Sequence, residues 1–127
     1  MKFASKALLV VACVMGAATV LLAAFVAHKA ESLSPHALRS VQSAMQLQQF
    51  HVLALLVMGA IAWLHAPSKT LLAAGVLIVM GLLMFSVNIL LVHLAGVDTF
   101  RAATPYGGMA FVAGWLFLAA WAWRLKH

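Results

Sequence analysis

Four long apolar runs, each without Asp, Glu, Lys or Arg, constrain this chain more than any other feature of its sequence. The first covers residues 7–27, and at 1.5 Å per residue a helix of that length measures about 31 Å, close to a bilayer core of about 30 Å. Hydrophobic residues make up 66% of the 127 residues and charged residues only 8%. Soluble domains are about half apolar and about a quarter charged, and a small domain cannot bury such a surplus. We therefore expect most of this surface to face lipid.

The runs predict four membrane spans, at about residues 7–27, 49–65, 71–95 and 105–123. The connections between them are short, which predicts sequential antiparallel packing. The predicted fold is all-α: an integral membrane four-helix bundle that forms a single domain over residues 1–127. A cleaved signal peptide is the alternative for the first run, since Lys2 and Lys6 precede it. The run is long for a signal peptide, and cleavage after Ala27 would put the bulky Phe25 at the −3 position, so a retained helix is favoured.

The second span is expected to be the inner part of a longer helix. Ser34-Pro35 is a helix start signal, a hydroxyl cap followed by Pro in the first turn, and Thr104-Pro105 repeats it before the fourth span. From Pro35 to Gln49 the pattern is amphipathic. This segment is therefore predicted to be an amphipathic N-terminal extension of the second helix, lying at the membrane surface. Its polar stripe consists of Arg39, Gln42, Gln46 and Gln49.

The basic residues lie outside the apolar runs, where they indicate orientation rather than nucleic-acid binding. The net charge is +6, and cytoplasmic segments of membrane proteins are enriched in Lys and Arg. An N-in/C-in arrangement places five of the eight basic residues inside: Lys2, Lys6, Lys69, Arg124 and Lys126. Lys29, Arg39 and Arg101 would then lie outside. Trp63, Trp121 and Trp123 mark the same cytoplasmic ends, where an aromatic belt is expected.

Polar side chains are expected to collect in the outer half of this bundle. They are His28, Gln48, His51, Asn88, His93 and Thr104. Polar groups within a membrane usually face the bundle interior and find partners there. The simplest interpretation is structural: interhelical hydrogen bonds that fix the register of the helices.

Three functional interpretations stand beside the structural one. His28, His51 and His93 are possible ligands of a metal or haem, although their spacing matches no known ligand motif. The starts of the second and fourth helices, with three basic residues nearby, would suit a lipid head group or a quinone. Finally, the Gln-lined stretch is expected either to dock a larger membrane complex or to lie on the membrane surface.

Small residues predict where helices pack closely, because lipid provides no hydrophobic drive between them. Gly107, Ala110 and Gly114 share one face of the fourth helix, and Ala12 and Gly16 are spaced by one turn in the first. The indole of Trp115 lies near mid-span, so its N–H is expected either to find a partner in the bundle or to face lipid.

The sequence contains no catalytic constellation. Glu31 and Asp98, the only two acids, fall in loops, and Ser86 lies two turns from His93, about 10 Å along the axis and too far for direct proton transfer. The predicted function is a non-enzymatic accessory or interaction component of the plasma membrane, with no metal and no cofactor. Its expected partners are the lipid bilayer and either another membrane protein or further copies of itself. The alternative is a membrane protein that binds a haem, metal, quinone or lipid.

The motifs resemble one known family over nearly the whole chain. The most specific part is Thr104-Pro105, Gly107-Gly108, Phe111 and Gly114-Trp115. Further matches are Ala24-Phe25 and Ala27-His28, Leu33-Ser34-Pro35, Gln48, His51, Ala54-Leu55-Leu56 and Phe85-Ser86. The chain is similar to the transmembrane protein 256 family, whose bacterial members form domain of unknown function 423.

The resemblance implies a four-helix protein of the bacterial inner (plasma) membrane and assigns no reaction. This chain departs from the family pattern at several positions. Ala23, Val26 and Val87 stand where the family usually has Gly, Leu47 stands for Tyr, and Asn88 stands for Ser.

Overall fold

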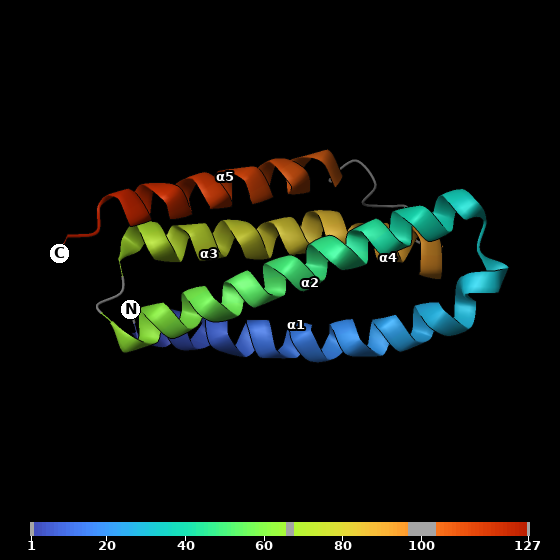
Figure 1. Ribbon diagram of the computed structural model, residues 1–127, viewed down its shortest axis with the longest axis horizontal. Coiled ribbons are helices and arrows are strands. Elements are labelled where there is room, and N and C mark those ends of the chain that lie inside the picture. Colours follow the sequence, from blue (N-terminus) through green and yellow to red (C-terminus); the bar gives the residue numbers. More distant parts are fainter. Residues whose placement is uncertain (1, 66–67, 97–103, 127) are drawn as a thin grey trace.

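The computed structural model describes residues 2–65, 68–96 and 104–126, and these ranges are almost entirely helical, with no strand. Four helical segments are long and apolar enough to cross a membrane: Lys2–Ser32, Pro35–Leu64, Lys69–Ala95 and Thr104–Trp123. They run side by side in alternating directions, so the first turn of the chain and its last helical turn lie at the same end (Figure 1). The predicted all-α membrane bundle is confirmed. Which side of the membrane that end faces stays a prediction.

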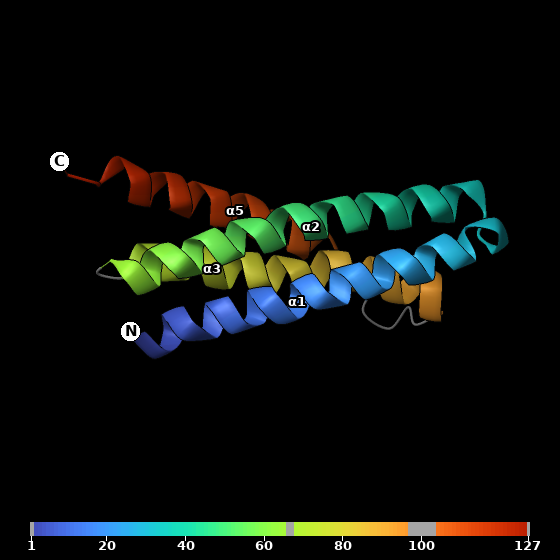
Figure 2. The ribbon, with the colours of Figure 1, turned by 60° about the horizontal axis from the view of Figure 1, so that its bottom comes forward.

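The first two helices form an antiparallel pair. Helix α1 (Lys2–Lys29) is joined to α2 (Pro35–Leu64) by the short 3-10 turn η1 (Ala30–Ser32). The predicted cap is present: the Ser34 hydroxyl accepts a hydrogen bond from the Ala37 amide at 3.1 Å, and Pro35 occupies the first turn. The amphipathic stretch and the second span are therefore one continuous helix. Its 30 residues measure about 45 Å, which exceeds the thickness of a bilayer core, and α2 crosses α1 obliquely (Figures 1 and 2).

The third helix begins at Lys69 rather than Leu71, because Ser68 caps it by accepting from the Leu71 amide at 3.0 Å. It is also less regular than the sequence predicts. After α3 (Lys69–Gly81), a π-helical turn η2 (Leu82–Val87), a short α4 (Asn88–Leu90) and a second π-helical turn η3 (Leu91–Ala95) follow without a break. Gly96 ends this helix with a positive φ of 70°, the usual glycine signal at a helix C-terminus. The predicted loop with Asp98 and Arg101 lies outside the described residues.

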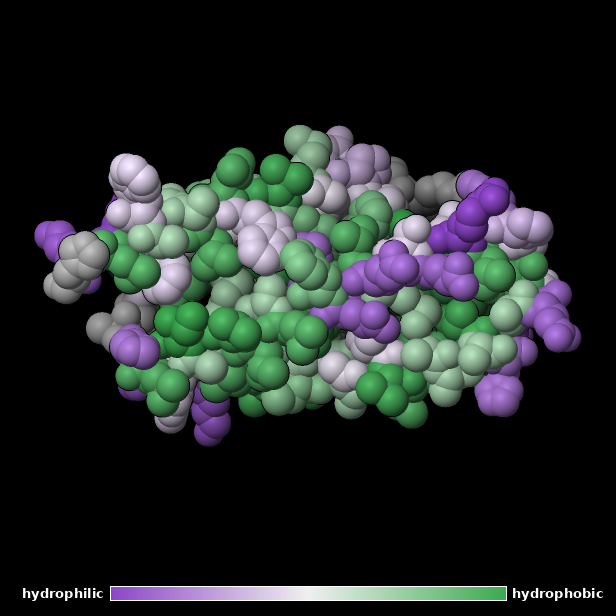
Figure 3. Space-filling model, in the orientation of Figure 1, coloured by the Kyte–Doolittle hydropathy of each residue, from purple (hydrophilic) through white to green (hydrophobic). Residues whose placement is uncertain are grey.

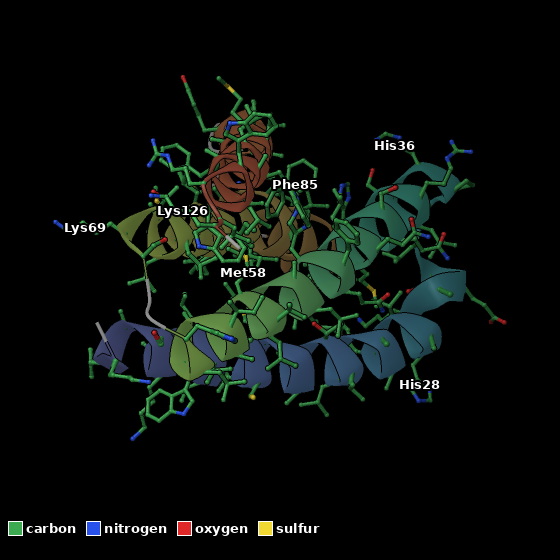
Figure 4. The ribbon with its side chains drawn as sticks, turned by 60° about the vertical axis from the view of Figure 1, so that its left-hand side comes forward. His28, His36, Met58, Lys69, Phe85 and Lys126 are labelled. Atoms are coloured by element: carbon green, nitrogen blue, oxygen red, sulfur yellow. The ribbon has the colours of Figure 1, made fainter. Side chains whose placement is uncertain are left out.

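The four helices do not form a closed ring. Helix α1 packs along α2, while α3 and η2 pack along α5 (Thr104–Trp123). The central pair is α2 and the third helix, with α1 and α5 on opposite sides of it (Figures 1 and 4). Fewer than a quarter of the residues in the most apolar window of α1 or α5 are buried, against 39% for the other two helices. The two outer helices therefore present most of their surface to whatever surrounds the protein.

Basic side chains tie the helices together at the end that holds both termini. The Lys2 ammonium donates a hydrogen bond to the carbonyl of Trp63 and lies 4.7 Å above the centre of that indole. A cation is favourable there because the last carbonyls of a helix have no partner within the helix. At the same end, Arg124 donates to the Thr70 hydroxyl at 3.4 Å. Lys69 and Lys126 lie nearby (Figure 4).

Glycines at the α3–α5 contact allow the two backbones to approach closely. A Cβ atom at Gly107 would lie 2.5 Å from the backbone nitrogen of Phe85, and one at Gly114 would lie 2.9 Å from Ile78. Phe111, between these glycines, is buried. Ala110 is only half-buried, so it lies beside this contact and not at its centre.

Other glycines contact neighbouring helices to different degrees. A Cβ at Gly16 would meet only Val52, at an ordinary 3.7 Å. By contrast, Gly59 and Gly75 closely contact the side chains of Leu9 and Leu8 of α1, respectively. The sequence pattern did not single out these two glycines.

Adjacent glycines on α5 provide a matched test of this contact. We expect Gly107→Ala to lower the free energy of unfolding by about 1–3 kcal/mol, because backbone atoms of η2 cannot move aside for the new methyl group. Gly108→Ala is the control, since its Cβ would meet nothing closer than 3.9 Å and alanine is the better helix former. Thermal unfolding of both variants in detergent measures the difference, and equal stability would contradict the packing described here.

Candidate functional site

Three side-chain hydrogen bonds join different pairs of helices, and they use most of the polar residues that the sequence singles out. Gln48 of α2 bonds Thr19 of α1, His51 of α2 bonds Trp115 of α5, and Asn88 of α4 bonds Thr104 at the start of α5. All four spans are thereby connected. Four of the six predicted residues, Gln48, His51, Asn88 and Thr104, thus fall in three separate pairs and not in one cluster.

The His51 imidazole is held on both nitrogen atoms. The Trp115 indole Nε1 lies 2.9 Å from Nε2, and the Leu47 carbonyl oxygen lies 2.7 Å from Nδ1. Because indole N–H only donates and a carbonyl only accepts, the imidazole is neutral, with its proton on Nδ1. The ring also stacks on Phe111, with centroids 3.9 Å apart. His51 therefore has no free lone pair for a metal or haem.

Gln48 belongs to a polar layer between two apolar clusters. Its amide Nε2 donates to the Thr19 hydroxyl at 2.7 Å, and that hydroxyl donates to the Met15 carbonyl at 2.7 Å. One cluster, which includes Val52 and Leu82, lies on one side of this layer, and the other, which includes Met45 and Leu90, lies on the opposite side. Ser86, between Leu82 and Leu90 in sequence, is fully buried. The Gln48 Oε1 and Ser86 Oγ atoms have no hydrogen-bond partner among the described residues.

Asn88 follows the first π-helical turn and bonds in two directions. Its amide Nδ2 lies 3.0 Å from the Thr104 hydroxyl and 3.5 Å from the carbonyl of Met84. The second contact is long, but it is directed at a carbonyl of the π-helical turn, where the regular α-helical ladder is interrupted. Asn88 thereby couples this irregular segment to the first turn of α5.

The predicted histidine set does not converge. His28 is exposed on α1 (Figure 4), His51 is occupied as described, and His93 makes an edge-on contact with His36 at 6.3 Å between centroids. No group of three or more His, Cys, Asp or Glu in the described ranges is placed to hold a metal ion.

The possible catalytic groups are equally dispersed. Ser86 is sealed in the interior, Glu31 is exposed at the turn between α1 and α2, and Asp98 lies outside the described residues. The described part of the chain therefore does not bring Ser86 and Glu31 together.

Two of the hydrogen bonds fix the level of α2 relative to its neighbours. Trp115 lies near the middle of α5 (Thr104–Trp123), and this 20-residue helix is about 30 Å long. Thr19 lies near the middle of the apolar run 7–27. Since Gln48 and His51 bond to these two residues, both lie level with the midpoints of their partner helices. The sequence placed them near one end of the second span.

Three further glutamines lie on the outer face of α2. Gln42, Gln46 and Gln49 are exposed, and no hydrogen bond joins their amides to another residue in the described part of the chain. They line a hollow of about 450 Å³ between α1 and α2, whose other walls include Ala23, Ala27 and Leu38. Figure 3 shows a hydrophilic patch over this part of α2, next to a largely apolar surface. At 1.5 Å per residue, Gln46 lies roughly 7 Å and Gln42 roughly 13 Å from the level of His51.

Comparison with known proteins identifies the family. A model described as "Protein of unknown function (DUF423)" matches residues 22–108. The chain belongs to this family. Among curated relatives of this DUF423 protein, the UPF0382 inner membrane protein YgdD of Escherichia coli (strain K12) is 30% identical over 124 residues, covering 97% of this chain and 94% of the relative.

A second relative comes from another bacterial group. The UPF0382 membrane protein SH2409 of Staphylococcus haemolyticus is 34% identical over 96 residues, which cover 75% of this chain and 77% of that protein. No solved structure matches. These matches confirm the resemblance drawn from the sequence, and the names of the relatives agree with a multi-pass protein of the inner membrane.

Several partners in these pairs were not evident from the sequence. The expectation that the Trp115 N–H finds a partner in the bundle agrees with the bond to His51, but nothing in the pattern named that partner. Thr19 and Phe111 were not proposed as partners of Gln48 and His51. Thr19 has one signal, since it is the sole hydrogen-bonding side chain in the apolar run 7–27 apart from Cys13.

A double-mutant cycle tests the bond between α2 and α5. We expect Trp115→Phe and His51→Leu each to destabilise the protein, and their coupling to be roughly 0.6 kcal/mol, the average for interhelical hydrogen bonds in membranes. Unfolding in mixed micelles measures all four species. Trp123→Phe is the control, because that indole is 91% exposed. Strict additivity of the two changes would contradict the bond.

In the Thr19–Gln48 pair, removing one partner should cost more stability than replacing both partners with apolar residues. Thr19→Val leaves the Gln48 amide without its partner, so we expect a loss of about 1–3 kcal/mol. Adding Gln48→Leu should restore most of that loss, because the double variant leaves neither an unpaired donor nor the orphan Oε1 in the interior. Chemical unfolding monitored by circular dichroism tests this, and a double variant less stable than Thr19→Val would contradict it.

Proposed function

We propose that this membrane protein is a non-enzymatic interaction component, which acts by associating with another membrane protein through the outer face of α2. One observation carries the proposal: Gln48, His51 and Asn88 inside the bundle join its helices, whereas three glutamine amides on its outer face have no partner among the described residues.

An unpaired amide is costly at the depth of that stripe. Hydrocarbon offers no hydrogen bonds, so an unpaired amide there costs about 4–8 kcal/mol relative to water. Gln49 and Gln46 lie within roughly 7 Å of the level of His51, and we infer that this level is near the middle of the bilayer. The membrane-crossing part of α2 then begins well before Gln49. Pairing with a partner at this face would remove the cost.

The open bundle also supports association. Helices α1 and α5 cover only opposite sides of the central pair, so one long face of α2 remains accessible. Polar and small residues are what contacting helices use in membranes. The hollow between α1 and α2 combines both, since glutamine amides face alanines of α1.

Isolation from native membranes tests this function. In gently solubilised membranes, we expect the protein to migrate as an assembly larger than its 13.5 kDa monomer. The triple variant Gln42→Leu, Gln46→Leu, Gln49→Leu should migrate as a monomer. Val112→Ala with Leu116→Ala is the control, since both residues are exposed on α5. Recovery of the unaltered protein alone and monomeric would contradict the proposal.

Ligand binding is a second candidate function, and one hollow favours an apolar ligand. About 480 Å³ lies between α2 and α5, and its walls include Phe50, Trp115 and Trp121. The tail of a quinone or lipid has the matching chemistry. Mass spectrometry of the purified protein for a bound, stoichiometric lipid or quinone tests this candidate, and its absence would exclude it.

A further inference from the structure

We propose that the partner of the glutamine face is a second copy of this chain, and that Gln42, Gln46 and Gln49 each pair with the same residue of that copy across a twofold axis. This inference rests on the proposed function and names its partner. The axis runs along the membrane normal, because both copies are inserted in the same orientation.

Symmetry restricts which side chains can serve at such an axis. In a parallel twofold dimer, residues at one depth meet their own counterparts, so each must be complementary to itself. A glutamine amide meets this condition, because it carries two N–H donors and a carbonyl acceptor. Two facing amides therefore form reciprocal hydrogen bonds. A lysine or glutamate at these positions would meet a like charge.

The spacing of the three residues fits helix pairing. Gln42, Gln46 and Gln49 are separated by four and then three residues, which is the repeat of a left-handed helix pair. Leu53 and Leu56 continue the repeat, and their side chains are 64% and 38% exposed. One continuous contact surface would thus run along α2, with amide pairs at Gln42, Gln46 and Gln49 followed by apolar contacts at Leu53 and Leu56. Arg39 lies one step earlier in the repeat, roughly 18 Å from the level of His51, where the charge can reach the head groups.

The neighbouring surface of α1 leaves room for the second copy. Ala23, Val26 and Ala27 of α1 and Ala30 of η1 line the hollow beside the glutamines. Val26, the largest of these four side chains, is buried. Gln49 also borders a second hollow of about 320 Å³ that ends at Gly16. A helix laid against α2 therefore finds a shallow groove with small residues along its α1 side.

Disulfide trapping tests the symmetric pairing. Cys13 is the only cysteine, so Cys13→Ala gives a cysteine-free background. Into it, Gln42→Cys, Gln46→Cys and Gln49→Cys are introduced singly and oxidised in native membranes with copper phenanthroline. Residues beside a twofold axis should form covalent homodimers at each of the three positions. Leu116→Cys is the control, since it is exposed on α5 next to Trp115 and so lies at a similar depth.

A second measurement keeps the inference testable if cysteine disturbs the face. Energy transfer between differently labelled copies in phosphatidylcholine vesicles should report self-association of the unaltered chain. Gln42→Leu, Gln46→Leu, Gln49→Leu should weaken it roughly twentyfold if each pair contributes as much as an average interhelical hydrogen bond. Circular dichroism confirms that the variant is folded.

The outcomes separate this inference from the proposed function. Cross-linking no stronger than at Leu116→Cys, together with no energy transfer, overturns the pairing of two copies. If native membranes still yield a larger assembly that the glutamine substitutions abolish, the partner is a different protein and the proposed function stands. If neither form of association is found, both proposals fall.

Discussion

The hydrogen bond from Trp115 to His51 links α2 to α5, two helices that otherwise make few contacts, and sets their relative height. Helices α2 and α5 are not neighbours in sequence, and the aromatic rings of Phe50, His51, Phe111 and Trp115 contact one another between them. In an environment without water, the indole N–H and the imidazole nitrogen both require a partner, so the two helices cannot slide past each other without losing one. The bond fixes the height of α2, and the height of α2 decides which of its glutamines lie deep in the molecule.

Much of the architecture could be predicted because it follows from local physics. Each of the four apolar runs is long enough to cross a bilayer, which predicted four helices. Ser34-Pro35 marked the start of α2, because hydroxyl caps and proline act within one turn. Membership of the DUF423 family was likewise readable from short motifs, above all the stretch from Thr104 to Trp115. These signals depend on residues close together in the chain.

The candidate site could be predicted only in part, because its contacts join residues that are far apart in the chain. Gln48, His51, Asn88 and Thr104 stand out in the sequence as polar residues, but their partners depend on how helices distant in sequence are placed. Nothing local to His51 indicates Trp115, and nothing local to Gln48 indicates Thr19. The π-helical turns were also missed, because the sequence of Leu82–Val87 and Leu91–Ala95 has the pattern of an ordinary apolar helix.

Those π-helical turns have a consequence for how the family can vary in length. Each turn holds about one residue more than an α-helical turn, so it takes up an extra residue locally. Removing one residue from Leu82–Val87 should return that segment to ordinary α-helix and leave the parts before and after it in nearly the same relative rotation. Asn88 would then still face Thr104, while Leu71, Ala74 and Ile78 before the turn would stay where they are. The third helix can therefore gain or lose a residue at this turn without changing which side chains face α5.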